Sequence, residues 1–150
     1  MHIWLDLEET IINNWNDGLL INVSRIKKWL VDNNISDIHI WSFAIWNDSD
    51  QLDFVDSGMK DSIERALDCK ILTYMSVAQM EQAVYEYERF RYDSQSEFMQ
   101  LNGKRWSFIK YCLLTHPTKK CILIDDAVPT LEMKVKKTQG EIHLINIDDI

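Results

Sequence analysis

The sequence contains little glycine and proline, with 4 and 2 residues among 150. This scarcity, together with the absence of a sequence period, excludes Gly/Ser linkers, repeats and long disordered segments. The chain also has no Gly-rich phosphate loop and no serine in a nucleophile elbow, which excludes P-loop NTPases and serine hydrolases. With 46% apolar and 27% charged residues, residues 1–150 are expected to form a single domain with no separate cap domain.

Long hydrophobic runs are absent as well. No apolar stretch approaches the ~18–20 residues that a membrane span requires. Asp6, Glu8 and Glu9 occupy the region where a signal peptide would need an apolar run. We therefore expect no membrane contact and a cytoplasmic location.

Cysteine and positive charge are both scarce. Cys69, Cys112 and Cys121 are odd in number and lack the paired spacing of zinc ligands, so buried free thiols are expected. The 16 basic and 24 acidic side chains give a formal net charge of −8. This charge disfavours a protein that coats nucleic acid or anionic membrane, although it leaves room for a local basic site.

What the sequence does contain is five short runs rich in Ile, Trp and Leu, each too short for a helix. Amphipathic helical patterns separate them, for example the apolar face of Leu19, Val23, Ile26 and Leu30. Strands that are apolar along nearly their whole length and alternate with helices indicate a parallel sheet covered on both faces. We predict a three-layer α/β/α, Rossmann-like fold with a mainly parallel five-stranded sheet. The predicted strands are residues 2–5, 38–41, 69–74, 121–124 and 142–147.

Polar side chains follow three of the predicted strands. Asp6 and Glu8 come after the first strand, and Ser42 follows the second. Asp125 and Asp126 follow the fourth. Ligands bind at the carboxyl ends of strands in open parallel sheets, so these side chains mark a candidate site. Taken singly, each acid also fits the role of a helix cap at a strand-to-helix turn.

The carboxylates among these residues need a positive partner if the strands adjoin. Two like charges about 4 Å apart repel by about 4 kcal/mol at an effective dielectric near 20. A hard divalent cation such as Mg²⁺, which takes oxygen ligands, would answer this charge. Lys104, which opens the helix predicted before the fourth strand, would supply a second positive charge.

In this order the motifs resemble those of the haloacid dehalogenase superfamily of phosphotransferases. The family's first motif, an apolar strand followed by Asp-x-Asp-x-Thr, is similar to residues 3–10, IWLDLEET. Its strand ending in Ser or Thr is similar to residues 38–42, and its lysine opening a helix to residues 103–106. Its apolar strand closed by acids is similar to residues 121–126, CILIDD. The resemblance implies a Mg²⁺-dependent phosphohydrolase acting on a phosphomonoester.

The resemblance also implies roles for individual residues. Asp6 would be the nucleophile that forms an aspartyl-phosphate, and Ser42 would hydrogen-bond a phosphoryl oxygen. Lys104 would neutralise charge between phosphate and nucleophile. Asp126 would bind Mg²⁺ beside Asp6 and the backbone carbonyl of Glu8, with Asp125 as a nearby second acid.

Glu8 departs from the family pattern, in which most phosphatases have an Asp that protonates the leaving oxygen and then activates water. The extra methylene moves the carboxyl group by ~1.5 Å, and misplacement on that scale can slow a positioned reaction by about 10²-fold. Two alternatives therefore stand beside the phosphohydrolase. One is a catalytically weak or inactive protein that binds phosphate for regulation. The other is a nucleotide or nucleic-acid end phosphatase.

The spacing of the motifs bears on the partners. Residues 11–37 leave room for one helix, and residues 43–103 for a helix, a strand and another helix. In the family, such an open site serves large phosphorylated substrates or takes a lid from a second copy, so a homodimer is one expected assembly. The compact chain also resembles small members of the family from large DNA phages. Residues 85–98 are a candidate partial lid and Lys134, Lys136 and Lys137 a candidate basic rim, but solvated surface is the favoured interpretation of both segments.

The four histidines show no close pair in the sequence. His39 and His143 alternate within predicted strands, whereas His2 and His116 stand near strand or helix ends. Core or edge positions are favoured over metal ligation for all four.

Overall fold

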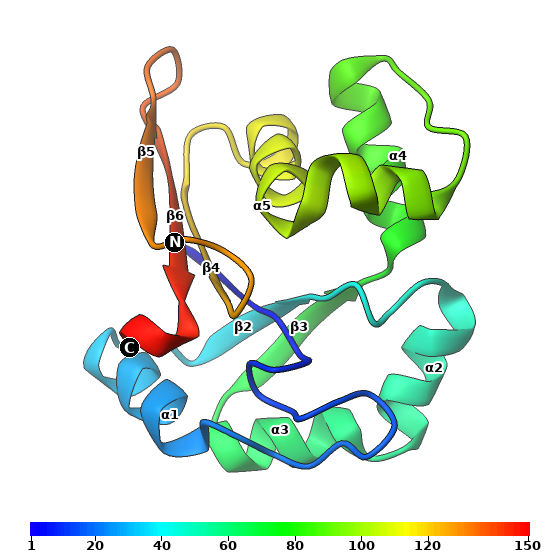
Figure 1. Cartoon of the computed structure of the whole chain (residues 1–150). Coiled ribbons are helices and arrows are strands. Elements are labelled where there is room, and N and C mark those ends of the chain that lie inside the picture. Colours follow the sequence, from blue (N-terminus) through cyan, green and yellow to red (C-terminus); the bar gives the residue numbers. More distant parts are fainter.

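The computed structural model describes residues 1–150 and is built on one six-stranded sheet in the order β3-β2-β1-β4-β6-β5 (Figure 1). All neighbouring strands are parallel except β5, which is antiparallel to β6. The predicted α/β class and the mainly parallel sheet are confirmed, but the number of strands is six and not five. The strands are β1 (His2–Leu5), β2 (Asp37–Trp41), β3 (Lys70–Met75), β4 (Lys120–Asp125), β5 (Leu131–Val135) and β6 (Gly140–Asn146).

The strand missing from the prediction is β5. Its sequence LEMKV alternates apolar and charged residues, and Glu132 and Lys134 are exposed while the residues between them are half-buried. Alternation of this kind is typical of an antiparallel edge strand with one wet face. A search for continuous apolar runs therefore passes over it.

Helices cover both faces of the sheet, which confirms the three layers. Figure 1 shows α1 to α3 below the sheet and α4 and α5 above it. Along β1 the side chains of Ile3 and Leu5 pack in the lower core, whereas Trp4 packs in the upper one. The helices are α1 (Val23–Asp32), α2 (Asp48–Asp56), α3 (Met59–Leu67), α4 (Val77–Glu88) and α5 (Gln95–Thr115), and a 3₁₀ turn (Ile147–Asp149) follows β6.

Two details of the predicted helices are wrong. Leu19 is 63% exposed and precedes α1, so the buried face of that helix consists of Ile26 and Leu30. Two short helices, α2 and α3, lie between β2 and β3 where one was expected. The side chain of Asn47 accepts a hydrogen bond from the backbone of Asp50 and so caps α2.

Side chains of α2 and α3 partly close the outer edge of β3. Glu64 of α3 accepts a hydrogen bond from the backbone N–H of Ile71 at 2.9 Å. Gln51 of α2 donates to the carbonyl oxygen of Tyr74 at 2.8 Å. Both contacts occupy backbone groups that an edge strand otherwise offers to another chain.

Two further sequence expectations meet the structure here. All three cysteines are free thiols; Cys112 and Cys121 are buried as expected, but Cys69 is half-buried. None of the helices combines the length and the apolar composition that crossing a bilayer needs.

Candidate functional site

Strand register brings three acids together at the carboxyl end of the sheet. β1 and β4 are parallel neighbours with Leu5 opposite Ile124, and the backbone N–H of Asp6 donates to the carbonyl of Ile124 at 3.0 Å. Asp6 therefore follows β1 beside Asp125 and Asp126 at the end of β4. One carboxylate oxygen from each acid lies within 4.8 Å of those of the other two.

A break in α5 carries Lys104 to these acids. Gly103 has φ 61° and ψ −174°, which interrupts the helix, and Lys104 opens its second half as the sequence predicts. A positive φ of this kind suits glycine, which has no Cβ to clash. The Lys104 Nζ lies 2.6 Å from Asp6 Oδ2 and 3.4 Å from Asp125 Oδ2. It is also 3.8 Å from Asp126 Oδ1.

Thr10 ties the two halves of the site together. Its hydroxyl is fully buried and donates to Asp6 Oδ2 at 3.1 Å. The same oxygen accepts the backbone N–H of Asp126 at 3.1 Å, across 116 positions of the sequence. The motif of residues 3–10 includes this threonine, but sequence reasoning gave it no role.

Burial makes the charges of this site interdependent. Asp6 is completely buried, and this burial, followed by the repulsion of Asp125, raises the pKa of Asp6 against the opposing effect of Lys104. Burial likewise raises the pKa of Asp125. Although burial opposes its charge, the neighbouring Asp6 and Asp125 raise the pKa of Lys104. One ammonium group thus faces three carboxyl groups, and the site is short of positive charge.

The unsatisfied oxygens show where further positive charge fits. Asp6 Oδ1 is buried and has no polar partner, whereas the buried Asp125 Oδ2 accepts no hydrogen bond and has only Lys104 Nζ beside it, at 3.4 Å. Unpartnered buried carboxylate oxygens are costly unless they coordinate a cation. Oxygen-only donors from Asp6, Asp125 and Asp126 suit a hard ion such as Mg²⁺. The residues present therefore fit the predicted cofactor.

Glu8 has a different environment from the other predicted ligands. Its Oε2 accepts the backbone N–H of Trp15 at 2.9 Å, and its carboxylate is not part of the three-acid cluster. Leu7, Ile11 and Ile12, in the segment that follows β1, are completely buried. The Glu8 side chain thus holds this segment to the loop at Trp15.

Ser42 lies at the predicted place, directly after β2, which is the other neighbour of β1. It is buried, and its hydroxyl oxygen accepts the backbone N–H of Ala44 at 3.1 Å. The hydroxyl proton therefore stays available as a donor. Sequence reasoning missed Asn146 at the end of β6, which donates to the backbone carbonyls of Asp126 and Val128 at 3.2 and 2.9 Å. It fixes the turn that carries Asp126.

The candidate lid and the candidate basic rim lie in different parts of the structure. The predicted lid segment consists of the end of α4, a connecting loop and the start of α5, in which Phe90 is exposed and Phe98 buried. The hairpin of Lys134 and Lys136 adjoins Gly140, at the start of β6. Because β6 runs parallel to β4, this hairpin lies at the amino end of the sheet, about 20 Å from the acids. These lysines therefore form no rim of the site, and their exposure agrees with the favoured interpretation of solvated surface.

Comparisons of the chain with protein family models, with curated proteins and with solved structures find no match. The argument for a function therefore rests on the geometry of this site.

Proposed function

We propose that the chain is a Mg²⁺-dependent phosphohydrolase of the haloacid dehalogenase type, acting on a phosphomonoester through an Asp6 phosphoenzyme. The observation that carries the proposal is the contact of 2.6 Å between Lys104 Nζ and the buried Asp6 carboxylate, with Asp125 and Asp126 beside them. A buried nucleophile needs its charge partly balanced, and a phosphoryl group brings further negative charge. A lysine at this position serves both needs.

The side chains divide the work as follows. A carboxylate oxygen of Asp6 attacks phosphorus, the bond from phosphorus to the ester oxygen breaks, and the leaving ester oxygen takes a proton from a water molecule. Lys104 holds Asp6 in place and balances charge on the transferring group. Ser42, whose hydroxyl proton is available, donates to a phosphoryl oxygen. Water then attacks phosphorus and releases phosphate and free Asp6.

The buried threonine and the acids at the end of β4 keep the nucleophile in position. Thr10 fixes Asp6 Oδ2 and the backbone of Asp126 through one hydroxyl group. Asp6, Asp125 and Asp126 would hold Mg²⁺, which supplies positive charge toward the phosphoryl oxygens when bound. Every other part of this arrangement is supplied by the chain itself.

One observation favours a second candidate function, a phosphate-binding regulatory protein. Glu8 occupies the position of the usual acid–base residue, yet one of its oxygens is taken by Trp15. General acid–base help typically contributes 10²–10⁴-fold. A chain without it would bind phosphate, or accept it on Asp6, and turn over slowly.

Phosphate release from a panel of phosphomonoesters, with and without Mg²⁺, tests the proposal. The panel includes 3′-phosphorylated oligonucleotides, mononucleotides and phosphopeptides, and the natural chain is measured beside Asp6→Asn. We expect Mg²⁺-dependent release that Asp6→Asn reduces by about 10⁴-fold or more. Equal rates in the two proteins would exclude Asp6 as the nucleophile. No release by either, with saturable phosphate binding, would favour the regulatory protein.

A further inference from the structure

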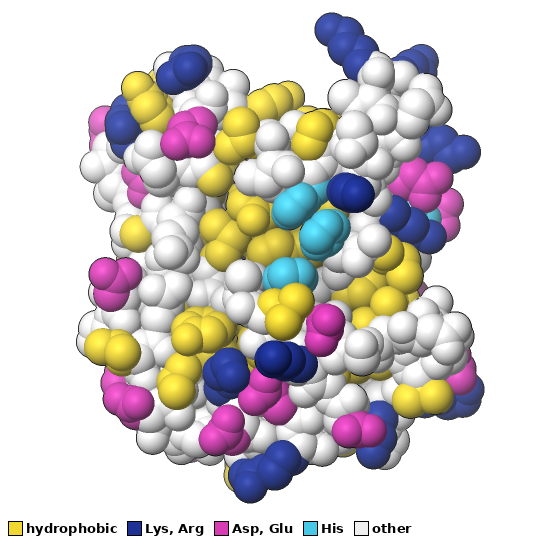
Figure 2. Space-filling model, turned by 180° about the vertical axis from the view of Figure 1, so that it is seen from behind, with side chains coloured by type: hydrophobic (Ala, Val, Ile, Leu, Met, Phe, Trp, Pro, Cys, Tyr) yellow, Lys and Arg dark blue, Asp and Glu magenta, His cyan; other side chains and the backbone are white.

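Three histidines form a cluster at the amino end of the sheet, far from the acids. His2 begins β1, His39 lies within β2, and His116 follows α5. The rings of His2 and His116 are stacked with centroids 4.2 Å apart, and those of His2 and His39 are 5.7 Å apart. Figure 2 shows them as one cyan patch, with a basic side chain beside it and hydrophobic side chains next to it. The parallel pairing of β1 with β2 and the position of the turn after α5 bring these three residues together, although they are far apart in the sequence.

The turn that carries His116 is firmly held. The backbone N–H of Lys119 donates to the carbonyl of His116 at 3.2 Å, and Glu141 of β6 donates to the carbonyl of Lys119 at 3.0 Å. A Cβ on Gly140 would come within 2.2 Å of the carbonyl oxygen of Pro117, so only glycine permits this close approach. Hydrogen bonds and close packing therefore hold the turn against β6, and the fold itself fixes the position of His116.

The cluster has no acidic partner in contact. Of the four histidines, only His143 lies within ion-pair distance of a carboxylate. The charged groups around the cluster are Lys119 and the amino group of Met1 beside His2, and Asp37 beside His39. Burial, followed by the other two imidazoles, lowers the pKa of His39 to about 4, and burial also lowers the pKa of His2 and His116. At neutral pH the three rings are neutral hydrogen-bond donors beside a lysine.

Ring geometry disfavours one shared metal ion. The planes of His2 and His116 differ by only 18°, and the lone pairs of an imidazole lie in the ring plane, so two parallel stacked rings do not converge on one atom. Neither ring makes a hydrogen bond within the chain, whereas His39 Nδ1 contacts Thr73 Oγ1 at 2.7 Å. The ring nitrogens of His2 and His116 are thus available to a ligand at their edges.

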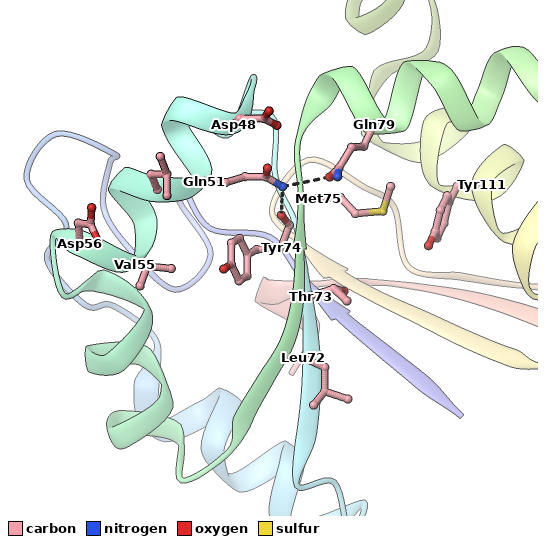
Figure 3. Close-up of a pocket in the computed structure, with 11 residues that line it drawn as sticks. Asp48, Gln51, Val55, Asp56, Leu72, Thr73, Tyr74, Met75, Gln79 and Tyr111 are labelled. Atoms are coloured by element: carbon pink, nitrogen blue, oxygen red, sulfur yellow. Dashed lines mark hydrogen bonds between the residues drawn. The ribbon is translucent and has the colours of Figure 1, made fainter.

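The largest cavity of the molecule begins where this cluster ends. It has a volume of about 850 Å³ and runs along β3 between α2 and α5 (Figure 3). Leu72, Met75 and Tyr111 give it an apolar and aromatic wall. Two lining residues touch the cluster: Thr73 through His39, and Tyr111 through the ring of His116 at 5.9 Å. Cavities of about 300–1,000 Å³ are typical of small-molecule sites.

The cavity is polarised along its length. Figure 3 shows Asp48 and Asp56 on α2, on the other side of β3 from Tyr111, with Asp56 the farther of the two from Tyr111. The histidines and Lys119 lie at the Tyr111 end. A ligand with an anionic group at one end and a neutral body at the other would avoid the two acids and reach the donors. A phosphate suits donors of this kind better than a carboxylate because it offers more oxygens and more charge.

We propose that this groove is a second ligand site, which binds an aromatic phosphate such as a nucleoside monophosphate. The phosphate lies against His2, His116 and Lys119, and the aromatic body lies in the cavity beside Tyr111. The site is separate from the acids: along β1, His2 and Asp6 are four residues apart, or about 13 Å. It does not depend on the proposed phosphohydrolase activity.

Binding of AMP, adenosine and inorganic phosphate to the full chain, in buffer free of divalent cations, tests this proposal. The readouts are calorimetric affinity and the imidazole resonances in NMR spectra. We expect AMP to bind at least tenfold more tightly than either fragment, with shifts of the His2 and His116 resonances. Affinity is expected to rise from about pH 8 to about pH 6, because a bound phosphate favours protonated imidazoles. Binding in the Asp6→Asn chain is expected to be unchanged.

Two variants and a matched control locate the site. His2→Gln and His116→Gln are each expected to weaken AMP binding by about tenfold, the usual effect of losing one charge-assisted hydrogen bond. His143→Gln, which replaces the histidine that carboxylates already partner, should leave affinity unchanged. The proposal is overturned if AMP binds equally well to both variants, if phosphate or adenosine binds as tightly as AMP, or if no probe binds saturably. It is also overturned if Asp6→Asn abolishes AMP binding.

Discussion

Each end of the central strands carries a cluster of ionisable side chains of one kind, carboxylates at one end and imidazoles at the other. The two clusters avoid charge repulsion in different ways. At the carboxyl end, Asp6 and Asp125 are fully buried, and Lys104 reaches into their midst. At the amino end, His2 and His116 are half-buried and have no carboxylate near them. The contrast shows that burial determines whether grouped ionisable side chains stay neutral or need a partner of opposite charge. Half-exposed imidazoles avoid repulsion by staying neutral, whereas buried carboxylates need cations.

Strand polarity explains why each cluster lies where it does. Parallel strands place all their carboxyl ends on one side of the sheet, where the loops to the helices begin, and ligands bind there in open α/β sheets. The amino ends are joined by the turns that return from the helices. Here two local features make the amino end a candidate site: the turn of His116, which hydrogen bonds hold against β6, and the cavity along β3.

The largest effect is expected from removing one lysine at each end of the sheet. Lys104→Met is expected to lower kcat/KM for the best phosphomonoester by about 10²–10³-fold, because it removes charge stabilisation from a buried site. Lys119→Met, at the other end, should leave kcat/KM within about twofold. Steady-state kinetics with Mg²⁺ measures both. Equal losses in the two variants would show that the ends are not separate.

Glu8 gives the next largest effect and separates two roles for one carboxylate. If Glu8 only holds the loop at Trp15, Glu8→Gln keeps the acceptor oxygen for that contact. Turnover should then stay within about threefold of the natural chain, and the melting temperature within a few degrees. If Glu8 transfers protons, Glu8→Gln should lower kcat by about 10²–10⁴-fold. The contact at 2.9 Å favours the first outcome. A flat pH profile of kcat in Glu8→Gln beside a bell-shaped one in the natural chain would contradict it.

Glu8→Asp completes this test by restoring the residue that the family usually has. The shorter side chain is expected to weaken the contact with Trp15 and so to release its carboxylate from that loop. A rise in turnover by an order of magnitude or more, from near zero in the natural chain, would support the regulatory protein. Unchanged turnover would show that the length of this side chain does not limit the reaction.

The layout of the acidic end was predictable because its residues follow strands directly in the sequence. Asp6 comes after the run of β1, and Asp125 closes the run of β4. Lys104 was found because it opens the helical pattern before the fourth strand, at the place where the family resemblance implies a lysine. Motif order and strand polarity were therefore enough to gather these side chains at one end of the sheet.

The histidine cluster was not predictable in the same way. His2, His39 and His116 are dozens of residues apart, and only the order β2-β1-β4 and the docking of α5 on that face bring them together. The strand β5 was missed because its period is two. A search for short continuous apolar runs sees neither strand order nor alternation, so it cannot reveal which remote positions become neighbours.

The contribution of Thr10 is expected in the free energy of unfolding, not in turnover. Thr10→Val keeps the shape of the side chain but leaves Asp6 Oδ2 and the backbone N–H of Asp126 without this partner. We expect the free energy of unfolding to fall by about 1–3 kcal/mol, the range for an unsatisfied buried polar group. Thr10→Ser, which keeps the hydroxyl, should lose less. Urea unfolding measures both, and a loss in Thr10→Ser as large as that in Thr10→Val would show that the hydroxyl group contributes no more to stability than the methyl group.

A further effect concerns the pH dependence of stability at the amino end. Burial and the neighbouring imidazoles lower the pKa of His39 to about 4 in the folded chain, from an ordinary value of 6.5. The unfolded chain therefore takes up this proton first as the pH falls. The contribution of His39 to stability is full above about pH 6.5 and is lost progressively between about pH 6.5 and 4.

His39→Asn isolates this contribution because its amide can still reach Thr73 but does not titrate. We expect its denaturation midpoint to fall less steeply than that of the natural chain between about pH 6.5 and 4, while the two differ little in slope above pH 7. Guanidinium unfolding at a series of pH values measures the difference. Parallel curves over the whole range would mean that the imidazole cluster accepts protons without strain. The half-exposed amino end would then tolerate like charge more easily than its packing indicates.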